Sequence, residues 1–419
     1  MERVELGQIL RLWADQGPGT RDQGPGPRLI SEPDPLKFMA AFADAVAGDS
    51  DVFLCDPNWG ETERAQVVAL TGLASPKLPR SAGGWLMIPT GGSSGKLKFA
   101  RHDQDTITVA VQGFTRHFGL PCVNAVGMLP LHHVGGFMAW MRCALTGGEY
   151  RPLDWKAVEQ GAVPELPAKL DGWVISLVPT QLERLLRQPA ATAWLAKFRI
   201  VFLGGAPAGG DLMDRAAAAR IPLSPGYGMT ETAAMVTALR PEEFLAGARS
   251  SGDALPQVKV AISGDGMITV AGDSLFRGYY PEWRNEGAFE TADLGRIDEQ
   301  RRLHVLGRGD EVIITGGEKV NPAEVEAVLR GSGGLPDVVV IGVPDTEWGQ
   351  VVVAAYPGVA WPDVAKLKEA ASGLSTHKRP KHFLPLESWP VTSAGKVNRP
   401  EVARLVRSGL RNNTKQESS

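Results

Sequence analysis

The feature that most constrains the fold is a repeated order of apolar, strand-like runs, each followed by an amphipathic, helix-like segment. The runs AVGMLP (125–130), WVISLVP (173–179) and FRIVFLGG (198–205) precede GGFMAWMRCAL, TQLERLLRQ and DLMDRAAAAR, respectively. Strands that are joined through helices pair in parallel and bury both faces of their sheet. This order predicts an α/β fold with a mainly parallel, doubly wound sheet, whose ligand loops lie at the carboxyl ends of the strands.

Later in the chain the elements become shorter. VKVAISGDGMITVAG (258–272) and RRLHVLG (301–307) alternate apolar and polar residues, which is typical of an antiparallel sheet or a small barrel. After GRGDE (307–311), a strand, a helix over 322–330, two β runs and a further helix indicate a small α+β unit. We expect a large N-terminal domain with doubly wound sheets and a small β-barrel-like part over 1–308, a mobile α+β C-terminal domain over 309–410, and a disordered polar tail over 411–419.

Composition excludes several classes of protein. The formal net charge of −3 provides no basic field for nucleic acid. No stretch approaches the roughly 20 consecutive apolar residues that span a bilayer, and the N-terminus lacks the apolar core of a signal peptide. The 3 cysteines fit no disulfide framework, which favours a reducing cytosol. We therefore expect a soluble, cytoplasmic protein, and the oligomeric state stays open.

The stretch IPTGGSSGKLKFARH (88–102) has the composition of a phosphate-binding loop. Its glycines let successive backbone N–H groups face one anion, its hydroxyl residues add neutral donors, and Lys98 adds a positive charge. The spacing is not that of a P-loop, because Lys98 stands three residues beyond Gly95 and no hydroxyl residue follows it. A kinase or a P-loop ATPase is therefore disfavoured. Taken alone, the stretch is also compatible with a flexible surface loop.

The stretch GYGMTETAAMV (226–236) carries a second candidate site. Tyr227 lies between two glycines and can present its ring face to a planar base. Thr230 and Glu231 place a hydroxyl beside a carboxylate, which suits phosphate and Mg²⁺, respectively. The alternative is an ordinary helix N-cap, since Thr-Glu-Thr commonly opens an apolar run.

Two later stretches carry further candidates. Asp293 could accept two ribose hydroxyls and Arg308 could donate to the same sugar, although the alternatives are a turn-stabilising acid and a surface cation. Lys396 follows a Ser-Ala-Gly turn and, in isolation, is a solvated charge. His132 and His133 lack the third ligand and the spacing of a zinc site, so no zinc site is predicted there.

In this order, the motifs resemble those of the adenylate-forming superfamily of acyl-CoA synthetases, peptide-synthetase adenylation domains and luciferases. TGGSSGKLK is similar to the family loop T-S-G-T-T-G-x-P-K, although Leu97 replaces its proline. YGMTET, TADLG, LGRGDEVIITGGEKVNPAEVE and TSAGKVNR are similar to four further family motifs. The resemblance implies that a carboxylic acid attacks ATP to give an acyl-adenylate and pyrophosphate, and that the thiol of CoA then displaces AMP.

The resemblance also implies a role for each matching residue, with ATP, Mg²⁺ and CoA as the cofactor and co-substrates. The implied catalytic residues are Lys396, which bridges the substrate carboxylate and the α-phosphate, Thr230, and Glu231, which holds Mg²⁺. The implied ATP- and AMP-binding residues are Thr90, Gly91, Gly92, Ser93, Ser94, Gly95, Lys98, Gly205, Ala206, Pro207, Tyr227, Gly228, Met229, Asp293 and Arg308. The implied acyl pocket comprises His133, Gly135, Gly136, Gly204, Met229 and Ala234. Asp310 takes the hinge position, and Gly316 and Gly317 face the CoA tunnel.

Pro225 departs from the Asn that is common in the family, so the adenine amino contact must come from elsewhere.

The resemblance also indicates which carboxylic acid is the substrate. YGMTETAAM and the early position of the phosphate loop resemble o-succinylbenzoyl-CoA synthetases of menaquinone and phylloquinone biosynthesis, although Ala234 stands where Ser is expected. This implies an acid–thiol ligase for o-succinylbenzoate, with His133 either as a donor to the ring carboxylate, directly or through water, or as a wall of the pocket that packs against the ring. The alternatives are another aromatic or short acid, a stand-alone adenylation domain that loads a carrier protein, and a binding-only homologue.

Overall fold

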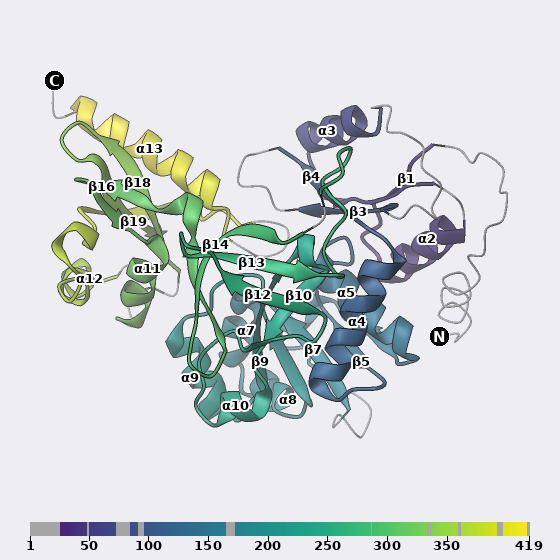
Figure 1. The fold of residues 1–419 in the computed structure, drawn as a ribbon. Coiled ribbons are helices and arrows are strands. Elements are labelled where there is room, and N and C mark those ends of the chain that lie inside the picture. The colour runs from purple at the N-terminus through teal and green to yellow at the C-terminus, as the bar shows by residue number, and fades with distance from the viewer. Residues whose placement is uncertain are drawn as a thin grey trace.

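The structure, a computed structural model, describes residues 26–47, 50–72, 84–90, 96–164, 172–285, 287–332, 335, 337–358, 362–391 and 397–416, with side chains as far as 409. Figure 1 shows a large N-terminal part that contains the sheets up to β15 and a smaller C-terminal part beside it. The predicted α/β architecture, with a large N-terminal domain and a small α+β C-terminal domain, is confirmed. Among the helices of the described residues, none is long and apolar enough to cross a membrane.

The first sheet has four strands in sequence order, and its last two strands form the antiparallel pair that flanks the glycine-rich stretch. Its strands are β1 (Arg28–Ile30), β2 (Val52–Leu54), β3 (Leu86–Thr90) and β4 (Lys98–His102). Helices α2 (Pro35–Ala47) and α3 (Glu61–Thr71) belong to the same region. Thr90 pairs with Lys98 in the register of β3 and β4, so the two ends of the predicted phosphate loop are held side by side.

The second sheet has seven strands in the order β11-β10-β9-β8-β7-β5-β6, and the segment from β6 to β9 is parallel. Its strands are β5 (Asn124–Gly127), β6 (Tyr150–Pro152), β7 (Trp173–Leu177), β8 (Ile200–Leu203), β9 (Leu223–Met229), β10 (Ala234–Ala238) and β11 (Asp253–Ala254). Its helices are α4 (Gln104–Phe118), α5 (Val134–Thr146), α6 (Trp155–Glu159), α7 (Pro179–Leu186), α8 (Pro189–Leu195), α9 (Gly210–Ala218) and α10 (Pro241–Leu245).

Alternation along β8 explains why this sheet is covered on both faces. Ile200 and Phe202 pack in a core with α4 and α5, whereas Val201 and Leu203 pack in a second core with α7, α8 and α9. Successive side chains of a strand point to opposite faces, so an apolar run buries both. The doubly wound arrangement predicted from the alternating runs is confirmed.

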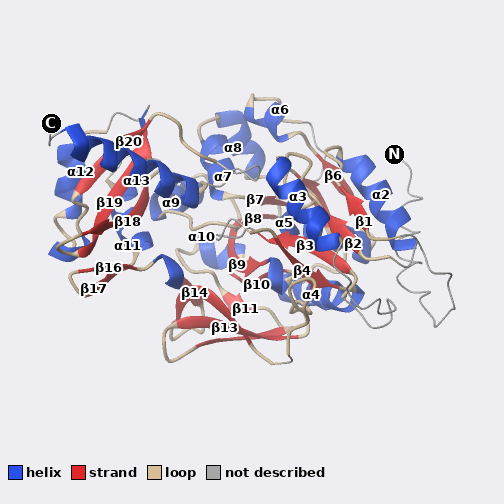
Figure 2. Ribbon diagram, turned by 90° about the horizontal axis from the view of Figure 1, so that it is seen from above, coloured by secondary structure: helices blue, strands red, loops and turns tan. Residues whose placement is uncertain are grey.

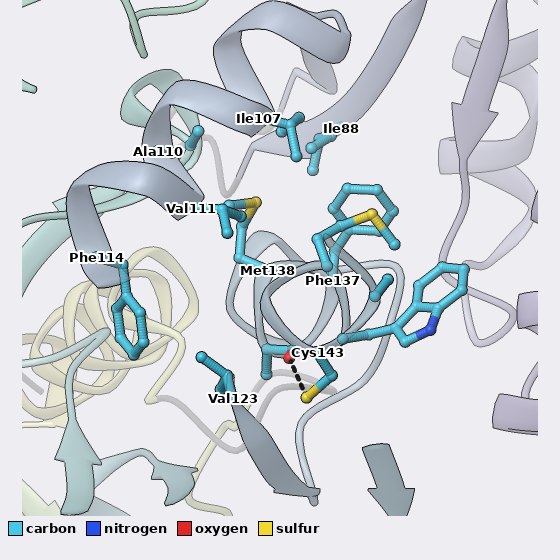
Figure 3. Packing of buried hydrophobic residues seen from close by; sticks show 14 of the residues in the cluster. Ile88, Ile107, Ala110, Val111, Phe114, Val123, Phe137, Met138 and Cys143 are labelled. Atoms are coloured by element: carbon cyan, nitrogen blue, oxygen red, sulfur yellow. Dashed lines mark hydrogen bonds between the residues drawn. The ribbon is translucent and has the colours of Figure 1, made fainter. Parts of the chain in front are cut away.

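The first core joins the two sheets through α4 and α5. Figure 3 shows Ile88 of β3, Ile107 and Val111 of α4, and Phe137 and Met138 of α5 pointing toward one another. All five side chains are at most 3% exposed. Burial of each large apolar side chain contributes about 1.5–3 kcal/mol, so this core fixes the first sheet against α5.

The third sheet is antiparallel, with strands β12 (Val258–Ile262), β13 (Met267–Gly272), β14 (Phe289–Ile297) and β15 (Leu303–Arg308) in that order. The sequence left a sheet or a small barrel open. Within the described ranges, β12 and β15 form the edges of an open sheet, because no ladder joins them.

The C-terminal part contains a hairpin, a three-stranded sheet and helices, as Figure 2 shows for β18, β19, β20, α12 and α13. Its elements are β16 (Ile313–Thr315), β17 (Glu318–Val320), α11 (Pro322–Gly331), β18 (Val339–Asp345), β19 (Gly349–Pro357), α12 (Val364–Ala371), β20 (His382–Leu386) and α13 (Arg399–Gln416). Its two core clusters draw their buried residues from 313 onward. Helix α13 extends into the segment 411–419 for which the sequence predicts disorder, because buried Val402 and Val406 anchor its first turns and a helix propagates easily once it is nucleated.

Asp103 is a polar junction within the N-terminal part. Its carboxylate caps α4 by accepting hydrogen bonds from the backbone N–H groups of Asp105 and Thr106. The same carboxylate accepts from the N–H of Gly84 at 3.1 Å and from Nε of Arg277 at 2.8 Å. Its side chain is only 1% exposed. One carboxylate thus ties the start of α4 to the approach to β3 and to the segment that follows β13.

We predict that Asp103→Ala lowers the free energy of unfolding by about 2–4 kcal/mol, since it removes a helix cap and leaves buried N–H groups without an acceptor. Urea unfolding followed by circular dichroism measures the change. Asp105→Ala is the matched control, because Asp105 is an exposed acid in the same helical turn, where the cost is below about 1 kcal/mol. Equal losses in the two variants would contradict the role of Asp103 as a junction.

Candidate functional site

The candidate site is centred on the connection between β9 and β10. This connection contains a short 3₁₀ turn, Thr230–Thr232, followed by Ala233 and Ala234 at φ of 52° and 72°. Left-handed φ values are costly for residues other than glycine, so neighbouring contacts must hold them. Thr232 supplies such contacts, since its hydroxyl lies 2.6 Å from the carbonyl oxygen of Ala234 and accepts from the N–H of Met229 at 3.0 Å.

His102 fixes this turn from the end of β4. Its Nε2 lies 2.8 Å from the carbonyl oxygen of Thr230, and its Nδ1 lies 3.1 Å from the hydroxyl of Thr106. Burial lowers the pKa of His102 to about 4, so the ring is neutral near pH 7 and Nε2 carries the donated proton. The neutral imidazole therefore holds Thr230 beside the strand that begins at Lys98.

Glu231 and Lys98 meet at Tyr279, a residue that the sequence analysis missed. The phenol of Tyr279 donates to Oε1 of Glu231 at 2.7 Å, and Nζ of Lys98 lies 5.1 Å from the centre of the Tyr279 ring. Burial, and then the charge of Glu231, raises the pKa of Tyr279, so its hydroxyl remains a donor. A cation and a carboxylate that the sequence predicted for phosphate and Mg²⁺ are thus brought to one aromatic ring.

The predicted ribose residues also lie together. Asp293 and Arg308 pair in the register of β14 and β15, and Nη1 of Arg308 lies 3.7 Å from Oδ1 of Asp293. The hydroxyl of Tyr227 donates to Oδ2 of Asp293 at 2.7 Å. Burial, and then the charge of Asp293, raises the pKa of Tyr227. The phenol that the sequence assigned to adenine therefore also orients the predicted ribose carboxylate.

Arg308 connects this group to the predicted hinge. Its Nε and Nη2 donate to the two carboxylate oxygens of Asp310 at 2.9 Å and 2.8 Å. The bonds raise the pKa of Arg308, and the guanidinium lowers the pKa of Asp310. Asp310 lies in a short 3₁₀ turn, 309–311, between β15 and β16. One arginine is thus shared between the ribose candidates and the hinge candidate.

The other predicted loops lie at the edges expected for a doubly wound sheet. Gly204 and the exposed segment 205–207 follow the carboxyl end of β8. His133 occupies the N-cap position of α5, with Gly135 and Gly136 in its first turn. A Cβ at Gly136 would lie 2.2 Å from the carbonyl oxygen of Pro130, so close backbone packing requires this glycine.

Some predicted residues lie outside the described part of the chain, and three predicted glycines have evident roles in the backbone structure. Gly91, Gly92, Ser93, Ser94, Gly95 and Lys396 lie outside the described residues. Gly316 and Gly317 form the turn of the β16–β17 hairpin, where both have positive φ and Gly316 donates to the carbonyl oxygen of Trp348. Gly228 packs against β10, because a Cβ there would lie 1.8 Å from the carbonyl oxygen of Ala234.

Arg142 is a second residue that sequence reasoning missed. It is 6% exposed, and its guanidinium carbon lies 4.1 Å from the ring centre of Phe114 and 5.9 Å from that of Phe202. Burial lowers its pKa to about 10, which leaves it protonated at neutral pH. No acidic side chain among the described residues forms an ion pair with it. The available signal was an arginine within an otherwise apolar helix, on the same face as Gly135 seven residues earlier.

Two family models and several curated proteins are similar to this chain. The family model described as "AMP-binding enzyme" matches residues 45–280, and the one described as "AMP-binding enzyme C-terminal domain" matches residues 324–396. The 2-succinylbenzoate–CoA ligase of Enterococcus faecalis is 31% identical over 325 residues, which cover 74% of this chain and 67% of that protein. The ligase of the same name from Listeria monocytogenes serotype 4b is 34% identical over 65% of this chain and 59% of that protein.

Two further proteins extend the comparison. The indoleacetate–CoA ligase of Aromatoleum aromaticum is 29% identical and covers 90% of this chain and 78% of that protein. The o-succinylbenzoate CoA synthetase of Bacillus subtilis, solved with the acyl-adenylate OSB-AMP, matches with a TM-score of 0.76 at 20% identity, over 95% of this chain and 91% of that one. The chain thus spans about three fifths to two thirds of the two succinylbenzoate ligases, and it shares the fold of the solved synthetase.

The buried state of His102 predicts a pH dependence of stability. The pKa of His102 is 6.5 in the unfolded chain and about 4 in the folded chain. Between these two pH values the proton therefore binds preferentially to the unfolded state. The contribution of neutral His102 is complete above pH 6.5 and falls by roughly 3 kcal/mol as the pH drops to 4. His102→Gln, whose amide can still donate to Thr230, should flatten the unfolding free energy over this interval. Parallel profiles for the variant and the wild type in urea titrations would contradict it.

Proposed function

Since the chain belongs to the AMP-binding enzyme family, we propose that it joins a carboxylic acid to CoA through an acyl-adenylate, and that the acid is 2-succinylbenzoate. In the first step a carboxylate oxygen attacks the α-phosphorus of ATP, and pyrophosphate leaves. In the second step the CoA sulfur attacks the acyl carbon, AMP leaves with the bonding electrons, and the thiol loses its proton. Both products of ATP cleavage, pyrophosphate and AMP, are anions that the site must bind.

The first step requires two anions to approach each other, so placement of cations is the main catalytic device. Lys98 at the start of β4 and the glycine-rich stretch before it are assigned to the β- and γ-phosphates. Glu231 is assigned to Mg²⁺, which supplies charge neutralisation when bound. The contact of Tyr279 with both residues supports this assignment, because it orients the carboxylate beside the lysine. Lys396 is assigned to the bridge between the substrate carboxylate and the α-phosphate.

The sugar and the hinge are assigned to one connected group. Asp293 accepts the ribose hydroxyls, and Tyr227 keeps that carboxylate oriented. Arg308 lies close enough to Asp293 to contact the same sugar, while its bidentate bond restrains Asp310. Rotation about Asp310 after adenylation would withdraw Lys396 and present Gly316 and Gly317 to the thiol, so that one site serves both steps.

The single observation that carries the choice of acid is the buried cation Arg142. A buried charge without a counter-ion is strongly unfavourable, and no acidic side chain of the described residues pairs with Arg142, so a substrate carboxylate would stabilise this guanidinium. It lies on the face of α5 that starts at Gly135, and it packs against Phe202, two residues before Gly204. A substrate with two carboxylates can present one to ATP and the other to Arg142. The ring carboxylate of 2-succinylbenzoate fits this requirement.

Among the alternatives, another aromatic acid is the strongest, because the indoleacetate–CoA ligase covers more of this chain. A monocarboxylic acid, however, gives Arg142 no second carboxylate, and the described residues supply no acidic partner for it. A stand-alone domain that loads a carrier protein would use the same first step and differ only in the thiol. A binding-only homologue would lack that step altogether.

We predict that Lys396→Ala lowers the rate of adenylation at least about 100-fold, because the lysine acts only on the α-phosphate. The rate of thioester formation from pre-formed acyl-adenylate should change little. Stopped-flow pyrophosphate release and CoA-ester formation measure the two steps separately. Lys366→Ala, an exposed lysine of α12, is the control that should change neither. Equal loss in both steps would contradict a single catalytic lysine that moves away between them.

We predict that Arg142→Met raises the KM for 2-succinylbenzoate about 100-fold and changes the KM for 3-benzoylpropionate, which lacks the ring carboxylate, by less than about threefold. Mass detection of the CoA esters measures both substrates. Arg116→Met, an exposed arginine of α4, controls for loss of charge alone. An equal rise in KM for both acids would show that Arg142 serves only in packing. A preference of the wild type for 3-benzoylpropionate would contradict the assignment of 2-succinylbenzoate as the substrate.

A further inference from the structure

Three side chains that can ligate a metal ion converge at the beginning of α5. Asp56 follows β2 in the first sheet, whereas His132 and His133 immediately precede α5 beside the second sheet. One ligand atom from each lies within 4.8 Å of the others. The sequence predicts no zinc site here, because the two histidines have no third ligand at a suitable spacing in the chain. The fold supplies that ligand from a distant part of the chain.

The spacing suits one small cation. Nε2 of His132 lies 3.5 Å from Oδ2 of Asp56, and the two imidazole rings lie 4.4 Å apart between centroids. Ligand atoms bound at about 2.0–2.1 Å to a tetrahedral ion are about 3.3 Å from each other. The distance of 3.5 Å between His132 and Asp56 is longer than a good hydrogen bond, yet it matches two ligands of a shared ion.

The burial of the cluster also favours an ion. Asp56 and His132 are each 5% exposed, and Nε2 of His132 is buried without a hydrogen-bond partner. A buried polar nitrogen that faces a carboxylate at this distance lacks the contact that normally compensates burial. A divalent ion bound by Nε2 of His132 would supply that contact.

Asn58 orients the carboxylate in the manner of an outer-shell residue. Its backbone N–H and its side-chain amide donate to Oδ1 of Asp56 at 2.9 Å and 3.1 Å. These bonds hold Oδ1 in place, and Oδ2 is the carboxylate oxygen that lies 3.5 Å from Nε2 of His132. Carboxylates that ligate metals are commonly held in this way by outer-shell hydrogen bonds. The neighbouring thiol of Cys55 instead points to the carbonyl oxygen of Phe53.

We propose that Asp56, His132 and His133 bind a divalent transition-metal ion such as Zn²⁺, which links the first sheet to the beginning of α5. Two imidazoles and one carboxylate favour Zn²⁺, Co²⁺ or Ni²⁺ over Mg²⁺, and three protein ligands leave one position for water or a carboxylate oxygen. His133 then serves as a ligand, and recognition of the ring carboxylate falls to Arg142. This inference is independent of the proposed reaction.

The test uses tag-free full-length protein, stripped with chelator and titrated with Co²⁺ in buffer without ATP. We expect one equivalent to give the visible absorption of a four-coordinate Co²⁺ ion, which one equivalent of Zn²⁺ then abolishes. Zn²⁺ should also raise the Tm of the wild type, because the ion binds the folded state. His132→Phe and Asp56→Asn should each lose the absorption band and the Tm shift, or weaken Co²⁺ binding at least 100-fold.

His304→Gln is the matched control, because His304 also contacts a carboxylate, that of Asp298 at 2.8 Å, and no third ligand joins this pair among the residues that the structure describes. This variant should keep the band unchanged. Circular dichroism of the metal-free proteins identifies a variant that fails to fold, and the milder Asp56→Asn then decides. Absence of the band in the wild type, or its persistence in folded Asp56→Asn, would overturn the proposal.

Discussion

The structure depends on the adjacent residues His102 and Asp103 at the end of β4. The carboxylate of Asp103 gathers the start of α4, the approach to β3 and Arg277. The imidazole of His102 reaches the turn at Thr230 from the same strand end. Because Lys98 begins that strand, these two side chains help to set its position relative to the β9–β10 connection. The site is therefore fixed by buried polar contacts as much as by apolar packing.

Sequence patterns predicted the parts of the fold that arise from local chemistry. Apolar runs such as β8 are buried on both faces, so their period and their following helices were sufficient to predict a doubly wound sheet. Asp293 and Arg308 could be placed together because both belong to recognisable motifs, and they became neighbours in an antiparallel ladder. The end of α13 was less predictable, since helix propagation depends on how firmly its first turns are anchored.

Contacts between distant segments could not be predicted in this way. Tyr279 meets Glu231 only because the segment after β13 folds back on the β9–β10 turn. Asp56 reaches His132 only because the first sheet packs beside α5. In the sequence, Arg142 is a single charge within an apolar helix, and only the fold shows that its guanidinium lies against the rings of Phe114 and Phe202. In each case the chemistry of the residue was visible, but its partner depended on tertiary packing.

The central claim is that this site adenylates an acid that carries a second carboxylate. The most direct measurement is exchange of labelled pyrophosphate into ATP by the wild-type protein, with Mg²⁺, without CoA, and with one acid at a time. The account predicts exchange with 2-succinylbenzoate and exchange at least about tenfold slower with 3-benzoylpropionate, because only the first acid compensates Arg142. Absence of exchange with every acid, or equal exchange with the two, would contradict it.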